Sequence, residues 1–220
     1  MPRPRVYDLD RVLDAAEALA VASGPGAVTI RGISAAIGVS NGALYHSFGS
    51  RAGLLAQAWL RAGRRFLDAQ AVVVNNTLSA PGRDAGIAAV AAAADAPAVF
   101  AEQHPNSCRL LLTMPRDELL DPELPDEIAS EISDLETALV GLMIRLARSV
   151  WDRKDTAAVD TITMCIVDLP TAVLLRRDRL RSETAREQLR AAVRAVLEIE
   201  PPAIRHTERT LNEEVKPPTQ

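Results

Sequence analysis

Residues 29–51, TIRGISAAIGVSNGALYHSFGSR, contain two short helical patterns separated by a tight turn. Thr29 is placed to cap the first helix, and Gly38 can adopt the positive φ with which many helices end. Ser40 can cap a second helix, which we place at about residues 41–48. The spacing of apolar residues predicts that the first helix buries Ile30, Ile33, Ala36 and Ile37.

The second helix of this stretch has a short polar face. Its apolar residues Ala43, Leu44 and Phe48 are predicted to pack inward, and the remaining side chains to point away from the core. This order is typical of the helix-turn-helix: one helix, then a glycine, an apolar residue and a serine, then a second helix. In that motif the second helix enters the major groove of DNA, while the first crosses the backbone. The stretch therefore predicts a DNA-reading element.

Helical spacing of apolar residues continues along the rest of the chain, and no strand alternation of comparable length occurs. Two short apolar runs, 72–74 and 110–112, are interpreted as buried helix because they have no strand-like neighbours to pair with. The fold class is therefore predicted to be all-α. Outside residues 29–51, the expected helices are 9–20, 50–80, 84–100 with a break near Pro97, 107–114, 128–150, 156–179 and 182–199.

The charge of the 220-residue chain is unevenly distributed. The formal net charge is −4, yet residues 1–65 carry eight arginines against four acidic residues, a net charge of +4. Residues 66–220 therefore sum to −8. This composition excludes intrinsic disorder and a uniformly basic nucleic-acid-coating protein, and it predicts that a polyanion meets only the first part of the molecule.

Two cysteines, Cys108 and Cys165, lie in apolar segments, which excludes a disulfide framework. Asp8, Asp10 and Asp14 interrupt the place of a secretory h-region, and the longest apolar stretch is about half a bilayer span. We therefore expect a cytoplasmic protein without a membrane partner.

Residues 6–60 resemble the TetR family of bacterial transcriptional regulators. An amphipathic helix over 9–20 precedes the stretch. The pattern that carries the resemblance is Thr29-x-Arg31-x-Ile33-Ser34-x-x-x-Gly38-Val39-Ser40-x-x-x-Leu44-Tyr45-x-x-Phe48-x-Ser50-Arg51-x-x-Leu54-Leu55. Ala43 departs from the family, whose members usually carry Thr or Ser there.

The resemblance implies roles for individual residues. Arg31, Asn41 and Gly42 correspond to base-reading positions, which agrees with the ability of Arg to fork onto guanine and of Asn to pair with adenine. Tyr45, His46 and Arg51 correspond to phosphate contacts. The N–H groups of the helix that begins at Ser40 favour an anion as well. Arg3 and Arg5 are expected to reach a minor groove or flanking phosphates.

The resemblance also implies a helix-turn-helix domain over 1–50 and a helical ligand-binding and dimerisation domain over 51–200. Residues 201–220 are rich in proline and mixed charge and lack an apolar stripe, so we expect a mobile tail there. We expect a homodimeric repressor that joins through its last two long helices, binds a palindromic double-stranded DNA operator and is released by a small-molecule effector. Candidates for the effector pocket are chosen by residue type and by a central position on a helix, and each is also a plausible core residue. They are Phe100, His104, Cys108, Met114, Met143, Trp151, Met164 and Asp168.

No phosphate loop, nucleophile elbow or metal-ligand spacing occurs in the sequence, so we expect neither an enzyme nor a cofactor. His104 and Cys108 stand four residues apart but lack a third ligand, and no metal is expected. The arginine-rich run over 176–181 is interpreted as a solvated helix end. The alternative function is an all-α small-molecule-binding or enzymatic protein whose N-terminal helices do not bind DNA.

Overall fold

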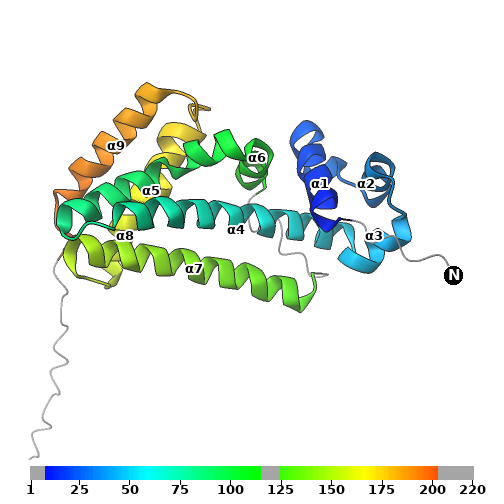
Figure 1. The fold of residues 1–220 in the computed structure, drawn as a ribbon, viewed down its shortest axis with the longest axis horizontal. Coiled ribbons are helices and arrows are strands. Elements are labelled where there is room, and N and C mark those ends of the chain that lie inside the picture. Colours follow the sequence, from blue (N-terminus) through cyan, green and yellow to red (C-terminus); the bar gives the residue numbers. More distant parts are fainter. Residues whose placement is uncertain (1–7, 115–123, 203–220) are drawn as a thin grey trace, which may run out of the picture.

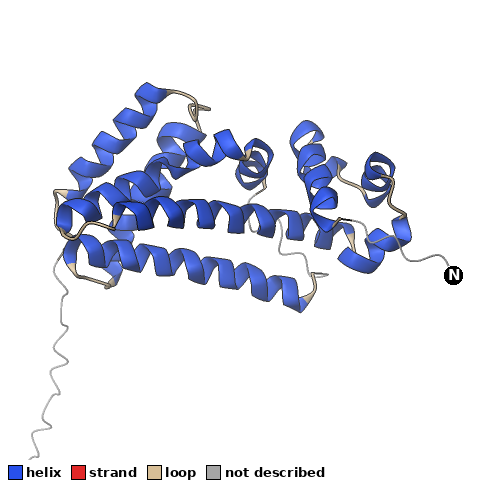
Figure 2. Ribbon diagram, viewed as in Figure 1, coloured by secondary structure: helices blue, strands red, loops and turns tan. Residues whose placement is uncertain are grey.

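The computed structural model describes residues 8–114 and 124–202. Helices joined by short turns account for this part of the chain, and no strand occurs within it, which confirms the all-α prediction (Figure 2). The helices are α1 (Leu9–Ser23), α2 (Ile30–Ile37), α3 (Asn41–Phe48), α4 (Arg51–Thr77), α5 (Arg83–Gln103), α6 (Pro105–Thr113), α7 (Asp126–Trp151), α8 (Thr156–Thr163) and α9 (Glu183–Leu197).

The long helix α4 runs through the length of the molecule (Figure 1). Helices α1, α2 and α3 gather at its N-terminal end, α7 lies along one side, and α5 lies along another. Helix α6 packs against α1, α4 and α5. One continuous helix thus connects the small N-terminal group of helices with the larger bundle.

Two large apolar clusters hold these parts together. The N-terminal cluster joins α1–α3 and the start of α4. It also includes Leu110 of α6 and Met114, the residue directly after α6. The larger cluster joins α4, α5, α7, α8 and α9 around Leu146, Ile162 and Leu189. Because α6 contributes to the N-terminal cluster while packing on α5, it connects the two.

Helix α9 is attached to α5 through buried charge. Asp95 is 7% exposed and accepts hydrogen bonds from Arg186 at 2.8 and 2.9 Å and from Arg190 at 3.0 Å. Arg186 also reaches Glu102 at 3.1 Å. These hydrogen bonds raise the pKa of Arg186, with the bond to Asp95 the largest cause. An acidic residue in an alanine-rich helix therefore fixes the position of α9.

The predicted break near Pro97 is wrong, because α5 continues through this residue to Gln103. Pro97 removes the N–H that would bond to the carbonyl of Ala93. The side chain of Gln70, on α4, donates a 2.9 Å hydrogen bond to that carbonyl instead. A tertiary contact that the sequence does not display thus allows the helix to continue.

The segment 156–179, predicted to be a single α-helix, also differs from the prediction. Helix α8 continues into two π-helical turns, Met164–Asp168 and Thr171–Leu175, on either side of Pro170, and helical structure ends at Leu175. Since Pro170 has no N–H, the ordinary bonding pattern is interrupted there, and the chain widens locally.

Three residues predicted to be buried are exposed: Ala36 on α2, Val72 on α4 and Leu112 on α6. The runs 72–74 and 110–112 are helical as predicted, but in each run one residue points to the core while another points outward. A helix rotates by about 100° per residue, so three consecutive apolar residues cannot all face one core.

Two helical segments are long and apolar enough to cross a membrane by length and composition. Arg83–Gln103 is 61% buried, as expected for a core helix. Thr156–Leu175 is only 33% buried and leaves Met164 and Val167 exposed. Arg3, Arg5 and all but the first two residues of the predicted mobile tail lie outside the described residues.

Candidate nucleic-acid interface

Side-chain caps define the helix-turn-helix. The Thr29 hydroxyl accepts from the N–H of Gly32 at 3.0 Å, and the Ser40 hydroxyl accepts from that of Ala43 at 3.2 Å, which confirms both predicted caps. Between them Gly38 adopts φ 71°, the left-handed conformation expected of it. The Ser34 hydroxyl donates to the carbonyl of Val39 at 2.6 Å and closes the turn.

Helix α4, which follows α3, also begins with a side-chain cap and a close backbone contact. Ser50 caps α4 by accepting from the N–H of Gly53 at 3.0 Å. A Cβ on Gly53 would lie 2.2 Å from the carbonyl oxygen of Phe48, so only glycine fits where α3 meets α4. Phe48 is itself buried, as expected of a core aromatic residue.

Helix α3 presents an open polar face. Leu44 and Phe48 anchor the helix in the N-terminal cluster, and the residues of this helix predicted to contact DNA lie on its solvent side. A Cβ added at Gly42 would meet nothing within 4 Å, so this part of the helix is open to an approaching surface. The exposed set comprises Ser40, Asn41, Gly42, Tyr45 and His46.

Arg31 lies at the start of α2 and is exposed. No carboxylate of the described residues lies within ion-pair distance of its guanidinium. Three other arginines of the basic N-terminal third, all on α4, contact acidic side chains instead: Arg61, Arg64 and Arg65. The positive charge available to a polyanion is therefore smaller than the sequence suggests, and Arg31 is a principal source of it.

Arg51, predicted to contact phosphate, is exposed, and its guanidinium also makes contacts within the protein. Its Nε donates to the carbonyl oxygen of Val28 at 2.6 Å and its Nη2 to that of Pro25 at 2.5 Å. These bonds tie the start of α4 to the short turn between α1 and α2. The geometry gives Arg51 a positioning role in the N-terminal group of helices.

A buried polar junction, missed in the sequence, joins this group to the rest of the molecule. Glu17 of α1 is 3% exposed and accepts from Arg61 of α4 at 2.7 Å and from Ser107 of α6 at 2.7 Å. Burial lowers the pKa of Arg61, but its bonds to Glu17 and Asp10 outweigh this effect, and the net shift is upward. The available signal was a glutamate beside Leu13 and Ala16 on the apolar stripe of α1.

The residues proposed for an effector pocket do not meet in one cavity. Phe100 is buried and packs edge-to-face on Phe66 at a centroid distance of 5.4 Å. Met114 and Met143 are also buried core residues, whereas Met164 and Asp168 are exposed on the outer side of their helix.

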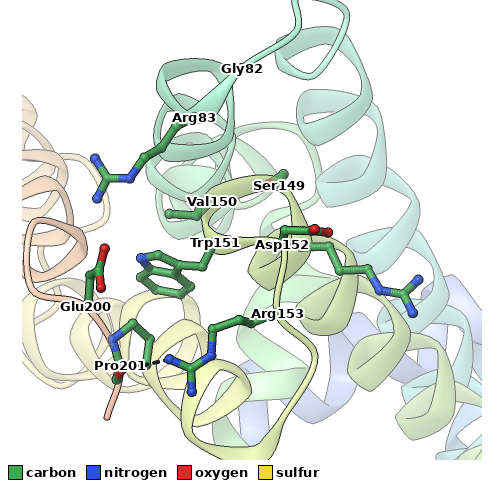
Figure 3. Close-up of a pocket in the computed structure, with 10 residues that line it drawn as sticks. Gly82, Arg83, Ser149, Val150, Trp151, Asp152, Arg153, Glu200 and Pro201 are labelled. Atoms are coloured by element: carbon green, nitrogen blue, oxygen red, sulfur yellow. Dashed lines mark hydrogen bonds between the residues drawn. The ribbon is translucent and has the colours of Figure 1, made fainter. Parts of the chain in front are cut away.

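The other three candidates lie in different places. His104 is half-buried beside Phe100, with their rings 5.2 Å apart. Cys108 borders a groove beside α6. Trp151 borders a separate pocket of about 440 Å³ at the opposite end of the bundle, with Arg83, Glu200 and Pro201 around it (Figure 3). The indole Nε1 of Trp151 is buried and has no hydrogen-bond partner among the described residues.

Comparison with known proteins agrees with the geometry of the N-terminal helices. Residues 12–58 match the model of the bacterial regulatory proteins of the tetR family. No curated protein sequence matches the chain.

Solved structures share the whole fold. A TetR-like transcriptional regulator from Rhodococcus sp. RHA1 is 19% identical, with 90% of this chain and 100% of that chain covered and a TM-score of 0.63. The TetR family regulator PfmR from Thermus thermophilus is 21% identical, with coverages of 86% and 98% and a TM-score of 0.56. FadR from Bacillus subtilis, solved in complex with stearoyl-CoA, is 14% identical, with coverages of 86% and 97% and a TM-score of 0.61.

At such identities the solved structures establish the fold, and the family match applies to the N-terminal helices. Residues 12–58 therefore match the tetR family of bacterial regulatory proteins, and the described chain has the fold of solved TetR-like proteins.

Proposed function

We propose that the protein is a cytoplasmic homodimeric repressor that binds a palindromic operator through α2 and α3 and leaves it when a small molecule binds the helical bundle. The observation that carries this proposal is the exposed polar face of α3, which is capped by Ser40 and anchored through Leu44 and Phe48. A short, rigid, outward-facing helix of this kind fits the major groove.

Within this surface we assign separate roles to base and backbone contacts. Arg31 and Asn41 have the side-chain chemistry for base edges, and the open space at Gly42 permits close approach to DNA. Ser40, Tyr45 and His46 are assigned to the phosphate backbone, which fixes register without reading sequence. Arg51 supports the surface through Val28 and Pro25.

Dimerisation is assigned to the last two long helical segments. Thr156–Leu175 is apolar yet only 33% buried, and its exposed Met164 and Val167 form part of an uncovered face. A second copy would remove this apolar area from water. Two-fold symmetry also supplies the second reading helix that a specific operator requires.

A small-molecule effector is supported by the fold rather than by one obvious cavity. FadR of Bacillus subtilis, with the same fold, was solved with stearoyl-CoA. Helix α6 contacts both the bundle and α1, which gives a bound molecule a physical route to the N-terminal helices. In this proposal residues 1–50 form the DNA-binding domain, and residues 51–200 form the domain that binds the effector and dimerises.

Fluorescence anisotropy with duplexes from the DNA flanking the gene tests the proposal. We expect salt-dependent binding to all duplexes and much tighter binding to one that contains a palindrome. Sedimentation of the free protein should give the mass of a dimer. A monomer that binds no duplex at any salt concentration would instead favour an all-α small-molecule-binding or enzymatic protein.

A further inference from the structure

A groove of about 590 Å³ lies between α6, the C-terminal end of α5 and the 175–181 segment at the end of the π-helical region. Its size falls within the range of small-molecule sites, about 300 to 1,000 Å³. Charged side chains stand among its lining residues: Glu102, Arg109, Asp178 and Arg181. Its apolar lining consists of Ala98, Ala101, Pro105, Cys108, Leu112, Leu175 and Leu180.

Two acidic and two basic side chains line the groove, and the arginines of the adjacent turn make the surrounding charge positive. Glu102 is 3.1 Å from Arg186, so its carboxylate is already partnered. No carboxylate of the described residues lies within ion-pair distance of Arg109 or Arg181. The turn that contains Asp178 adds three exposed arginines, Arg176, Arg177 and Arg179, at the edge of the groove. This concentration of arginine stands out because residues 66–220 carry a net charge of −8.

We propose that this α6 groove binds an amphipathic organic anion, an apolar body that carries one carboxylate. The planar guanidinium of arginine matches a carboxylate with two parallel hydrogen bonds, which Arg109 and Arg181 are free to supply. The apolar body lies on the alanine and leucine surface beside Cys108. Neither a neutral apolar molecule nor a small inorganic anion uses both parts of the groove.

The opposite side of α6 connects the groove to the DNA-reading helices. Ser107 donates to the buried carboxylate of Glu17 on α1 at 2.7 Å. The carbonyl of Met114, just after α6, accepts from the indole N–H of Trp59 on α4 at 3.1 Å. A ligand that shifts α6 therefore alters contacts with both α1 and α4. This regulatory consequence rests on the proposed operator binding, whereas occupation of the groove does not.

Isothermal titration calorimetry of the full chain with octanoate and with its methyl ester tests the site without DNA. We expect octanoate to bind and the ester to bind at least about tenfold more weakly, since the charge-assisted bonds are lost. Arg109→Gln and Arg181→Gln should each weaken octanoate binding by about tenfold. Arg148→Gln makes the same charge change at an exposed position far along α7 and should leave binding unchanged.

A steric variant gives independent support. Ala101 is half-buried and lines the groove, so Ala101→Phe should fill it and abolish octanoate binding while the circular dichroism spectrum stays helical. The inference is overturned if octanoate does not bind, if the ester binds equally well, or if the groove variants bind as the wild type does. Operator binding, measured separately on the wild type, decides the proposed function, so the two failures are distinguishable.

Discussion

The side-chain amide of Gln70 donates a 2.9 Å hydrogen bond to the carbonyl oxygen of Ala93, which lies four residues before Pro97. Proline has no N–H, so this carbonyl lacks its usual helical donor. Gln70 is 1% exposed, and the bond lies in the interior between α4 and α5. A side chain of one helix thus completes the hydrogen bonding of its neighbour.

A double-mutant cycle tests this relationship. Gln70→Met should lower the free energy of unfolding by about 1 to 2 kcal/mol, because the carbonyl of Ala93 is left buried and unpaired. In a Pro97→Ala background the new N–H can bond to that carbonyl, so the same Gln70 substitution should cost less. Urea denaturation of the four proteins measures the coupling. Equal costs in both backgrounds would show that the two residues act independently.

The difference between sequence and structure is clearest at such tertiary contacts. Local chemistry predicted the caps at Thr29 and Ser40 and the left-handed Gly38, because these depend on residues three or four positions apart. The continuation of α5 through Pro97 depends on Gln70, far away in the sequence, and no periodicity reveals it.

In the candidate site, too, local features were predictable from the sequence and contacts between distant residues were not. The exposed face of α3 follows from its local pattern. The bonds from Arg51 to Val28 and Pro25 span more than twenty residues, so no local pattern reveals that this arginine also makes contacts within the protein. The groove beside α6 is likewise assembled from α5, α6 and the 175–181 segment, so no single stretch of sequence could have predicted it.

Base reading by α2 and α3 predicts selective losses. Arg31→Ala and Asn41→Ala should each cost about 1 to 3 kcal/mol on the cognate operator and leave weak binding to scrambled duplexes nearly intact. Both side chains are exposed, so thermal stability should change little. Anisotropy titrations on the two duplexes compare the losses. A fall of equal size on both would assign these residues to the phosphate backbone.

The open space at Gly42 predicts a separation of stability from binding. Gly42→Ala meets no neighbour and should raise the free energy of unfolding by up to about 1 kcal/mol through helix propensity, while the added methyl reduces operator affinity by about tenfold. Gly141→Ala is the matched control, since it is exposed on α7 and also meets nothing within 4 Å. The control should gain stability and keep its affinity. If both variants bind the operator normally, α3 does not approach DNA at Gly42.

Arg51→Ala tests the positioning role. Loss of the bonds to Val28 and Pro25 should lower the free energy of unfolding by about 1 to 2 kcal/mol and weaken operator binding. The slope of log affinity against log salt should stay that of the wild type, because no counterion-releasing contact is lost. Titrations at several salt concentrations give the slope. A slope smaller by about two per dimer would instead show a direct phosphate contact in each half.

Both cysteine thiols should react slowly in the folded protein. Burial raises the pKa of Cys108 to about 11 and that of Cys165 to about 12. The reactive thiolate of Cys108 is then about one part in ten thousand at pH 7. Reaction with a chromogenic disulfide should be slow in buffer, fast in urea, and still rising with pH above 9. Rapid labelling of the native protein at pH 7 would contradict the burial of these side chains.

Selection of random duplexes by the wild-type protein and by Asn41→Ala tests the central claim most directly. A dimer that presents two copies of α3 should enrich a palindrome whose half-sites lie about one helical turn, or a multiple of it, apart. Asn41→Ala should lose sequence preference at one symmetric pair of positions and keep the rest. An asymmetric motif, no enrichment, or the same motif with both proteins would contradict operator reading by α3 of a two-fold dimer.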